Sequence, residues 1–177
     1  MAAIWDDDWL TLVGLLAETW AGMERSATRR LEADCGLSVQ WFELLLRLVR
    51  TPGHKLRMTD LAAQTTLTPS GLTRAIDRLV GAGLVAREHC AEDRRGAFAV
   101  LTDAGRDRIE AAVPVHLVQV ESVVLAGLSD DDRRDLERLL RVLRANVNPG
   151  AVAASTCPVD GEPGEGSDDP TEVGAEA

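Results

Sequence analysis

The segment from residue 68 to residue 105 constrains the fold of this 177-residue chain more than any other part. It opens with Thr68 and Pro69, which suit a helix N-terminus because Thr caps backbone N–H groups and the Pro nitrogen needs no hydrogen bond. Apolar residues then recur at helical spacing: Leu72, Ile76 and Leu79. Since Gly83 favours a helix end, the sequence predicts a helix from Pro69 to about Ala82.

Two short apolar segments follow this helix, LVAREH at 84–89 and AFAVLT at 97–102, and both are typical of strands. The tip between them carries the adjacent arginines Arg94 and Arg95. A ribbon with such a tip can place an arginine in the minor groove of DNA, because narrow A·T tracts attract positive charge. We expect Arg95 to reach the groove and Asp93 to orient it through an ion pair.

Amphipathic helical patterns flank this segment on both sides. On the N-terminal side, the sequence predicts a long helix over 6–34 that begins at three aspartates, a helix from Ser38 to Thr51, and a short helix over 60–64 capped by Thr59. On the C-terminal side, it predicts a helix from Thr102 to about Gly127 with a kink at Pro114, and a last helix that begins at a Ser129 capping box.

This order of elements, three helices followed by a β-ribbon, predicts a winged helix-turn-helix. The expected fold class is mainly α, with a two-stranded β-wing and flanking N- and C-terminal helices. We expect one domain over residues 1–150, in which residues 38–102 form a DNA-binding lobe. Residues 6–34 and 103–148 are then available for dimerisation.

The predicted helix from Pro69 has an outward face of hydroxyls and charges that suits a recognition helix. Hydroxyls near a helix N-terminus bind phosphate oxygens, and an arginine further along can reach guanine in the major groove. An ordinary solvated helix face is the alternative for this helix taken alone. Together with the wing, the predicted DNA-binding residues are Thr68, Ser70, Thr73, Arg74, Arg78, Arg94 and Arg95.

The net charge of −10 is a poor guide to the folded part, because residues 151–177 hold seven acids and no Lys or Arg. That segment is rich in Gly, Pro, Ser and Ala, and we expect a disordered acidic tail there. The three cysteines are widely spaced without a CxxC motif, so we expect no disulfide framework, no metal site and a cytoplasmic protein. No apolar run approaches 18 residues, so we expect no membrane span.

Two other classes of function compete with DNA binding. An enzyme is disfavoured, because no Ser-His-Asp order, metal cluster or phosphate loop is present and no cofactor is implied. The three histidines are scattered: His54, His89 and His116. A winged helix that binds only proteins is the other alternative, but such a surface has no need for an arginine tip oriented by its own aspartate.

The motifs in this block resemble the MarR family of bacterial transcription regulators. The family pattern combines a helix-turn-helix with a DRLxxxGLVxR run, a DRRG wing and an LTxxG helix start. Here these correspond to Asp77–Arg87, Asp93–Gly96 and Leu101–Gly105. No single motif is decisive, but their order and spacing together make the resemblance strong.

The resemblance implies a homodimer in which the first and the last two helices of each subunit interlock. The apolar stripes within 10–31, 109–125 and 136–147 would supply that interface, although the stripes alone would equally suit a monomer core. A two-fold dimer presents two recognition helices to successive major grooves, so the implied partner is double-stranded DNA with a roughly palindromic operator. The implied activity is that of a repressor of a nearby operon.

The resemblance also implies a small aromatic or anionic effector between the dimerisation helices and the DNA-binding lobe. The urate-responsive branch of the family uses a tryptophan, an aspartate and an arginine. The candidate positions here are Trp20, Glu43 and Arg50, with Glu in place of Asp. Core packing is the alternative role for the tryptophans.

A thiol-based redox response is a further alternative within the family. The peroxide-sensing branch uses a cysteine near the N-terminus supported by tyrosines. This chain has no Tyr, Cys35 lies at the end of the first predicted helix, and Cys90 borders the wing. A reactive thiol needs an electropositive, exposed site, and the sequence does not specify one.

Overall fold

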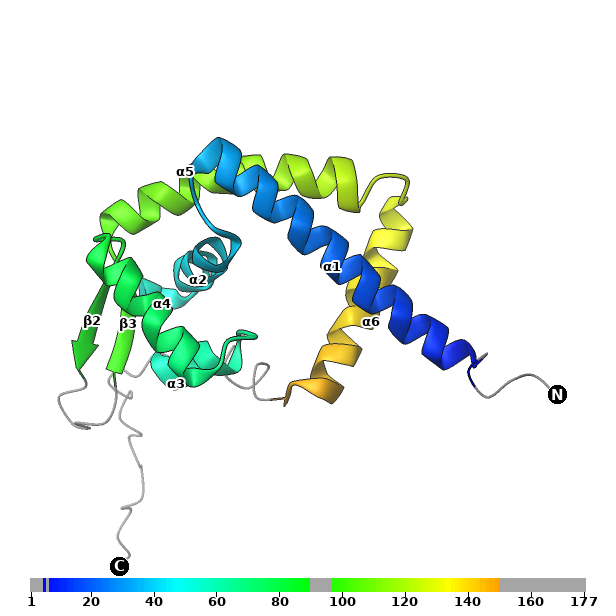
Figure 1. Ribbon diagram of the computed structural model, residues 1–177, viewed down its shortest axis with the longest axis horizontal. Coiled ribbons are helices and arrows are strands. Elements are labelled where there is room, and N and C mark those ends of the chain that lie inside the picture. The colour runs from blue at the N-terminus through cyan, green and yellow to red at the C-terminus, as the bar shows by residue number, and fades with distance from the viewer. Residues whose placement is uncertain (1–4, 6, 90–96, 150–177) are drawn as a thin grey trace, which may run out of the picture.

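The computed structural model describes residues 5, 7–89 and 97–149, and it is mostly helical (Figure 1). The helices are α1 (Asp8–Cys35), α2 (Val39–Arg50), α3 (Met58–Ala63), α4 (Pro69–Gly81), α5 (Asp103–Gln119) and α6 (Asp130–Val147). The strands are β1 (Lys55–Arg57), β2 (Val85–His89) and β3 (Ala97–Leu101). A 3₁₀ turn at Pro52–His54 precedes β1, and a π-helical turn at Val120–Val124 follows α5.

The core lies in a lobe formed by α2, α3, α4 and the sheet, together with the ends of α1 and α5 that reach it (Figure 1). Its fully buried side chains include Leu31 of α1, Leu45 of α2, Ile76 of α4 and Ile109 of α5. The ring of His116 packs against Phe42 with centroids 4.7 Å apart, and burial lowers the pKa of this histidine.

The order of elements in this lobe, α2, α3 and α4 followed by β2 and β3, is that of a winged helix-turn-helix, as the sequence predicts.

The sheet has three antiparallel strands in the order β1-β3-β2, so the prediction of a two-stranded ribbon was incomplete. The missed strand β1 pairs Leu56 with Ala99 of β3, and both side chains are buried. Three residues are too few to show a period-two pattern in the sequence. Only the pairing with β3, far along the chain, makes Lys55–Arg57 a strand.

Helix starts follow capping chemistry closely. Ser38, Thr68, Thr102 and Ser129 each accept a backbone N–H bond at the start of a helix, which confirms the predicted caps at Thr68, Thr102 and Ser129 and the predicted helix start at Ser38. The first helix begins at Asp8, two residues later than predicted, with the side chain of the N-cap Asp7 accepting from Trp9 N at 2.8 Å. The predicted cap at Thr59 was wrong, because α3 already begins at Met58 and has no side-chain cap.

The helix that begins after Thr102 is shorter than predicted. It runs through Pro114 and ends at Gln119. The chain then widens into the π-helical turn, in which Leu125 N donates to Val120 O at 2.9 Å. The side chain of Gln119 is buried and donates to Ser26 Oγ at 3.1 Å, so it ties this end of α5 to α1.

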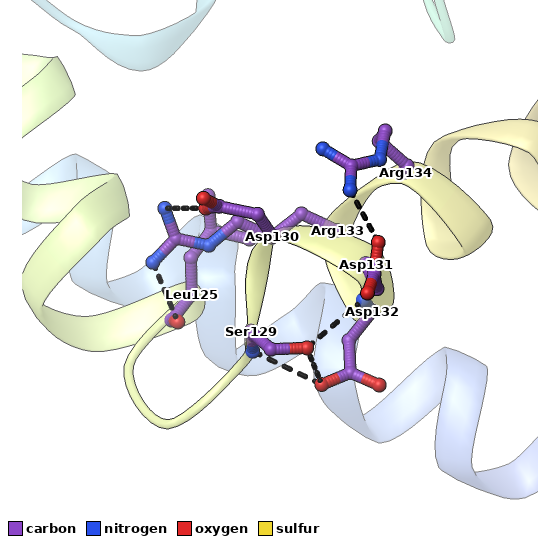
Figure 2. Close-up of polar contacts among 7 residues, drawn as sticks. All are labelled: Leu125, Ser129, Asp130, Asp131, Asp132, Arg133 and Arg134. Atoms are coloured by element: carbon purple, nitrogen blue, oxygen red, sulfur yellow. Dashed lines mark hydrogen bonds and ion pairs between the residues drawn. The ribbon is translucent and has the colours of Figure 1, made fainter.

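The connection between α5 and α6 is fixed by a network at the start of α6 (Figure 2). Ser129 N donates to Asp132 Oδ2 at 3.0 Å and Asp132 N donates to Ser129 Oγ at 3.2 Å, which is the predicted capping box. The hydrogen bonds from the Ser129 side chain and backbone lower the pKa of Asp132. Arg133 reaches back to donate to Leu125 O at 3.4 Å.

Helix α6 lies at the far end of α5 from the lobe and buries none of its residues (Figure 1). Its apolar stripe is exposed: Leu136, Leu139, Leu140, Leu143 and Val147. The N-terminal half of α1 is exposed in the same way, including Trp9, Leu10, Val13, Leu16 and Trp20. Among the described residues, no helix is long and apolar enough to cross a membrane.

Candidate nucleic-acid interface

The helix α4 is held in the lobe by one face and presents the other to solvent. Leu72, Ala75, Ile76 and Leu79 are buried on the inner face. At the N-terminus, Thr68 Oγ1 accepts from Gly71 N at 3.1 Å. The helix therefore packs into the lobe by its inner face and is capped at its start, and its two predicted faces are confirmed.

The outward face of α4 carries hydroxyls at its start and guanidinium groups along its length. Ser70, Thr73, Arg74 and Arg78 are all exposed. The Thr73 hydroxyl donates to Pro69 O at 3.0 Å, and Arg78 Nε donates to Arg74 O at 3.3 Å. Ser70 lies in the first turn of α4, at the positive end of the helix dipole, where phosphate oxygens are attracted, whereas Arg78 lies in the last turn.

Arg87 of β2 joins the wing to α4, and sequence reasoning missed this role. Its guanidinium lies 2.9 Å from Asp77 Oδ1 and donates to Thr73 O at 3.4 Å. The contact offsets the charge of Asp77, which is the only acidic residue of α4. The alternation of side chains along β2 could have predicted this contact, because Arg87 lies on the same face of the strand as the buried Val85 and so faces α4.

The predicted wing residues Asp93, Arg94 and Arg95 lie outside the described residues. The strands that carry them are described, and β2 pairs with β3 as far as His89 opposite Ala97. The pairing places His89 and Ala97 opposite each other, and Arg87 links β2 to α4.

The three candidate effector residues occupy different surroundings. Trp20 is exposed on α1, Glu43 is half-buried on α2, and Arg50 is exposed at the end of α2. Within the described part of the chain, no hydrogen bond, ion pair or ring contact joins Trp20 to either of the others. Burial raises the pKa of Glu43, while Arg47 lowers it and Glu24 raises it.

Arg47 is a half-buried group between Glu43 and Arg50 that the sequence did not single out. Its Nε is buried without a hydrogen-bond partner. Burial lowers the pKa of Arg47, and the positive charges of Arg144 on α6 and Arg50 lower it further.

Beside Arg144, the surface of α6 holds a hollow of about 480 Å³. The hollow is lined by Leu125, Arg133, Leu136, Glu137, Leu140, Arg141 and Arg144.

Cys35 is half-buried at the end of α1 and packs against the core, while Cys90 and Cys157 lie outside the described residues. Over residues 7–89 and 97–149, no three His, Cys, Asp or Glu side chains are grouped as metal ligands would be. Within the described lobe, the exposed hydroxyl and guanidinium groups that the sequence predicts to bind DNA lie on α4.

Comparison with known proteins gives this arrangement a family. A model described as the MarR family matches residues 36–96. The MarR family regulator Sco3205 of Streptomyces coelicolor, solved in complex with DNA, is 32% identical and superposes with a TM-score of 0.74. That match covers 83% of this chain and 92% of Sco3205. The chain belongs to the MarR family.

Other bacterial transcription regulators are similar over much of their length. AbsC of Streptomyces coelicolor is 29% identical, with a TM-score of 0.74 over 83% of this chain and 99% of AbsC. The transcriptional repressor YetL of Bacillus subtilis is 32% identical over 61% of this chain and 64% of YetL, which is just under two thirds of that repressor. The protein is thus a MarR family transcriptional regulator, and the resemblance seen in its sequence is confirmed.

Proposed function

We propose that this MarR family regulator is a homodimeric repressor that binds a roughly palindromic operator and is released by a small effector. The observation that carries DNA binding is the exposed face of α4, where the hydroxyls of Thr68, Ser70 and Thr73 lie toward the helix N-terminus and Arg74 and Arg78 follow toward its C-terminus. In this proposal the hydroxyls contact phosphates and Arg74 reads a base in the major groove. The complex of Sco3205 with DNA supports this partner.

The wing completes the proposed interface. Arg94 and Arg95 enter the minor groove beside each major-groove site, and Asp93 orients Arg95. The ion pair of Arg87 with Asp77 supports this arrangement, because it offsets the negative charge of a carboxylate on the surface that would face phosphates. The same pair holds β2 against α4, so both DNA-reading elements move together.

Dimerisation is proposed through α1, α5 and α6. The exposed leucines of α6 and the exposed tryptophans of α1 would bury their apolar surface against a second copy. Two-fold symmetry then sets the two α4 helices on successive major grooves, with residues 38–102 as the lobe that binds DNA. The segment 151–177 has no part in this interface and is proposed to be a separate acidic tail.

The effector is proposed to be a small anionic aromatic compound held by Glu43 and Arg50 of α2 and Trp20 of α1, with Arg47 as an added anion-binding group. The unpartnered Nε of Arg47 supports this choice, since a carboxylate would supply the acceptor it lacks. Salicylate at millimolar concentration should raise the melting temperature of the wild-type protein and not that of Arg47→Gln. Equal shifts for both proteins would place the site elsewhere.

Replacement of Arg74 by alanine tests the reading role of α4. We expect specific binding to the protein's own upstream DNA to weaken by about 1–3 kcal/mol, because a base-edge contact is lost. Preference at one base position per half-site should relax. Arg30→Ala, which removes an exposed arginine from α1, is the matched control and should leave affinity within about twofold.

Gel shifts of both variants on the upstream fragment and on random DNA of equal length provide the measurement. An equal loss on the two DNAs would mean that Arg74 contacts only phosphates. Unchanged binding of Arg74→Ala to the upstream fragment would contradict the assignment of α4 as the reading helix.

A further inference from the structure

The outer face of the wing sheet, away from the core, carries an organised set of side chains. Leu56, Val85 and Ala99 are buried on the inner face. Because side chains alternate along a strand, their neighbours Lys55, Arg57, Glu88 and Phe98 lie on the opposite face. In the register of the sheet, Phe98 is flanked by Arg57 on one side and Glu88 on the other.

One ammonium group ties this face together. Lys55 Nζ of β1 lies 2.7 Å from Glu88 Oε2 of β2, and the pair spans the central strand β3. The same Nζ lies 4.4 Å from the centroid of the Phe98 ring on β3. A cation over an aromatic face is attracted by the ring quadrupole. We name Lys55, Phe98 and Glu88 the sheet brace, because the three side chains join all three strands.

The sheet brace lies where the wing leaves the lobe. Glu88 pairs with Phe98 directly next to the last pair, His89 with Ala97, beyond which residues 90–96 carry the wing arginines. Its other end, Lys55, belongs to the strand that leads directly into α3. A two-stranded ribbon is marginally stable alone and twists more than a wider sheet, so attachment to β1 limits the directions the ribbon can take.

We propose that the sheet brace positions the wing for DNA, so that Lys55, Phe98 and Glu88 contribute to operator affinity without contacting bases. This inference rests on the proposed DNA-binding function. Its physical basis is conformational, because apparent affinity falls with the fraction of molecules whose wing points in the binding direction. Loss of the brace lowers that fraction and leaves the contacts of α4 unchanged.

Glu88→Gln distinguishes the brace from simple electrostatics by the sign of the effect. Removal of an acid from a DNA-binding lobe should strengthen binding if only charge counts. The brace gives the opposite result, a loss of about three- to tenfold, because the ammonium loses its charged partner and the strands lose their link. Glu110→Gln, which removes an exposed acid from α5, is the matched control and should bind as the wild type or slightly better.

Two duplexes separate wing positioning from general loss of structure. The long duplex carries the site from the protein's own upstream region with its flanking base pairs, and the short duplex is trimmed to the major-groove half-sites. The brace predicts that Glu88→Gln and Phe98→Leu weaken binding to the long duplex and bind the short duplex as the wild type does. A variant that is merely misfolded would lose affinity for both.

Lys55 is the only lysine of the chain, which gives a second, chemical test. Acetylation with an N-hydroxysuccinimide ester removes its positive charge, whereas reductive methylation keeps it. We expect acetylation to weaken binding to the long duplex as Glu88→Gln does, and methylation to have little effect. Treatment of the Lys55→Gln variant with the same ester reports the effect of acetylating the N-terminal amine alone. The untreated Lys55→Arg variant should retain most of the wild-type affinity.

The outcomes separate this proposal from the proposed function. If the wild type binds neither duplex, DNA binding itself is wrong and the brace has no role in it. If the wild type binds the long duplex better than the short one and Glu88→Gln binds both like the wild type, only the brace is overturned. Equal wild-type affinity for the two duplexes would also overturn the brace, because the wing would then contribute nothing to DNA affinity and its direction would not matter.

Discussion

Substitution of Gly105 by alanine is expected to lower the free energy of unfolding by about 2–4 kcal/mol. Gly105 is buried in the first turn of α5, where the helix lies against the backbone of Leu84 in the turn that follows α4. A Cβ atom at this position would lie 2.0 Å from Leu84 O and 2.8 Å from Leu101 Cδ1. The first of these atoms is backbone, so rotation of a side chain cannot relieve the clash.

The backbone around Leu84 is also fixed by other bonds, which is why the cost is large. Leu84 O accepts from Thr102 N at 3.2 Å, and Thr102 Oγ1 donates to Gly83 O at 2.7 Å. Moving the carbonyl away from a new Cβ would stretch these bonds and displace the N-cap of α5. The substitution thus strains the junction between the helix-turn-helix and the long helix that carries it.

Gly81→Ala is the matched control for this experiment. Gly81 is the last residue of α4, is exposed, and has nothing within 4 Å of an added Cβ. Alanine favours helix over glycine, so the control should be neutral or stabilise by up to about 1 kcal/mol. Urea unfolding of both variants at one protein concentration is the measurement. A Gly105→Ala protein within about 0.5 kcal/mol of the wild type would contradict the close approach of α5 to Leu84.

The second large effect is expected at α6. The double substitution Leu139→Glu and Leu143→Glu should weaken the proposed dimer by about 100-fold or more, because it would bury two unpaired carboxylates in an apolar interface. Both leucines are exposed within a single chain, 50% and 41% respectively. The substitutions therefore leave the buried core of the lobe intact, and the helical content of the monomer should persist.

A control that introduces two glutamates on the other face of α6 tests whether the effect depends on the leucine face. Arg134→Glu and Arg138→Glu introduce two glutamates at the same spacing, on side chains that pair only with Asp131 and Asp135 in the described structure. Sedimentation should show a dimer for this control and a monomer for the leucine variant, with circular dichroism confirming that both are folded. A leucine variant that sediments as a folded dimer would show that α6 is not the interface.

Local chemistry in the sequence was sufficient to predict most of the elements. Ser38, Thr68, Thr102 and Ser129 cap helices because a side-chain oxygen can satisfy N–H groups only a few residues away. The same locality explains the error at Thr59. No side chain caps the start of α3. That helix begins directly after β1 ends, so its start depends on the pairing of the strand.

The site was predicted in part for the same reason. The outward residues of α4 follow from helical period alone, which places Arg74 and Arg78 opposite the buried Ile76. The pairing of Arg87 with Asp77 and of Lys55 with Glu88 joins different elements. No local pattern specifies such pairs, because they depend on which strands become neighbours.

By itself the sequence determined the helix boundaries set by caps, the amphipathic faces and the family motifs, since each depends on residues close along the chain. Only the tertiary structure decided that Lys55–Arg57 is a strand, because three residues gain strand geometry from pairing with β3. It also decided that the leucines of α6 are left exposed by their own chain. Burial is a property of what packs against a residue, and the same apolar stripe would serve equally as a core or as an interface.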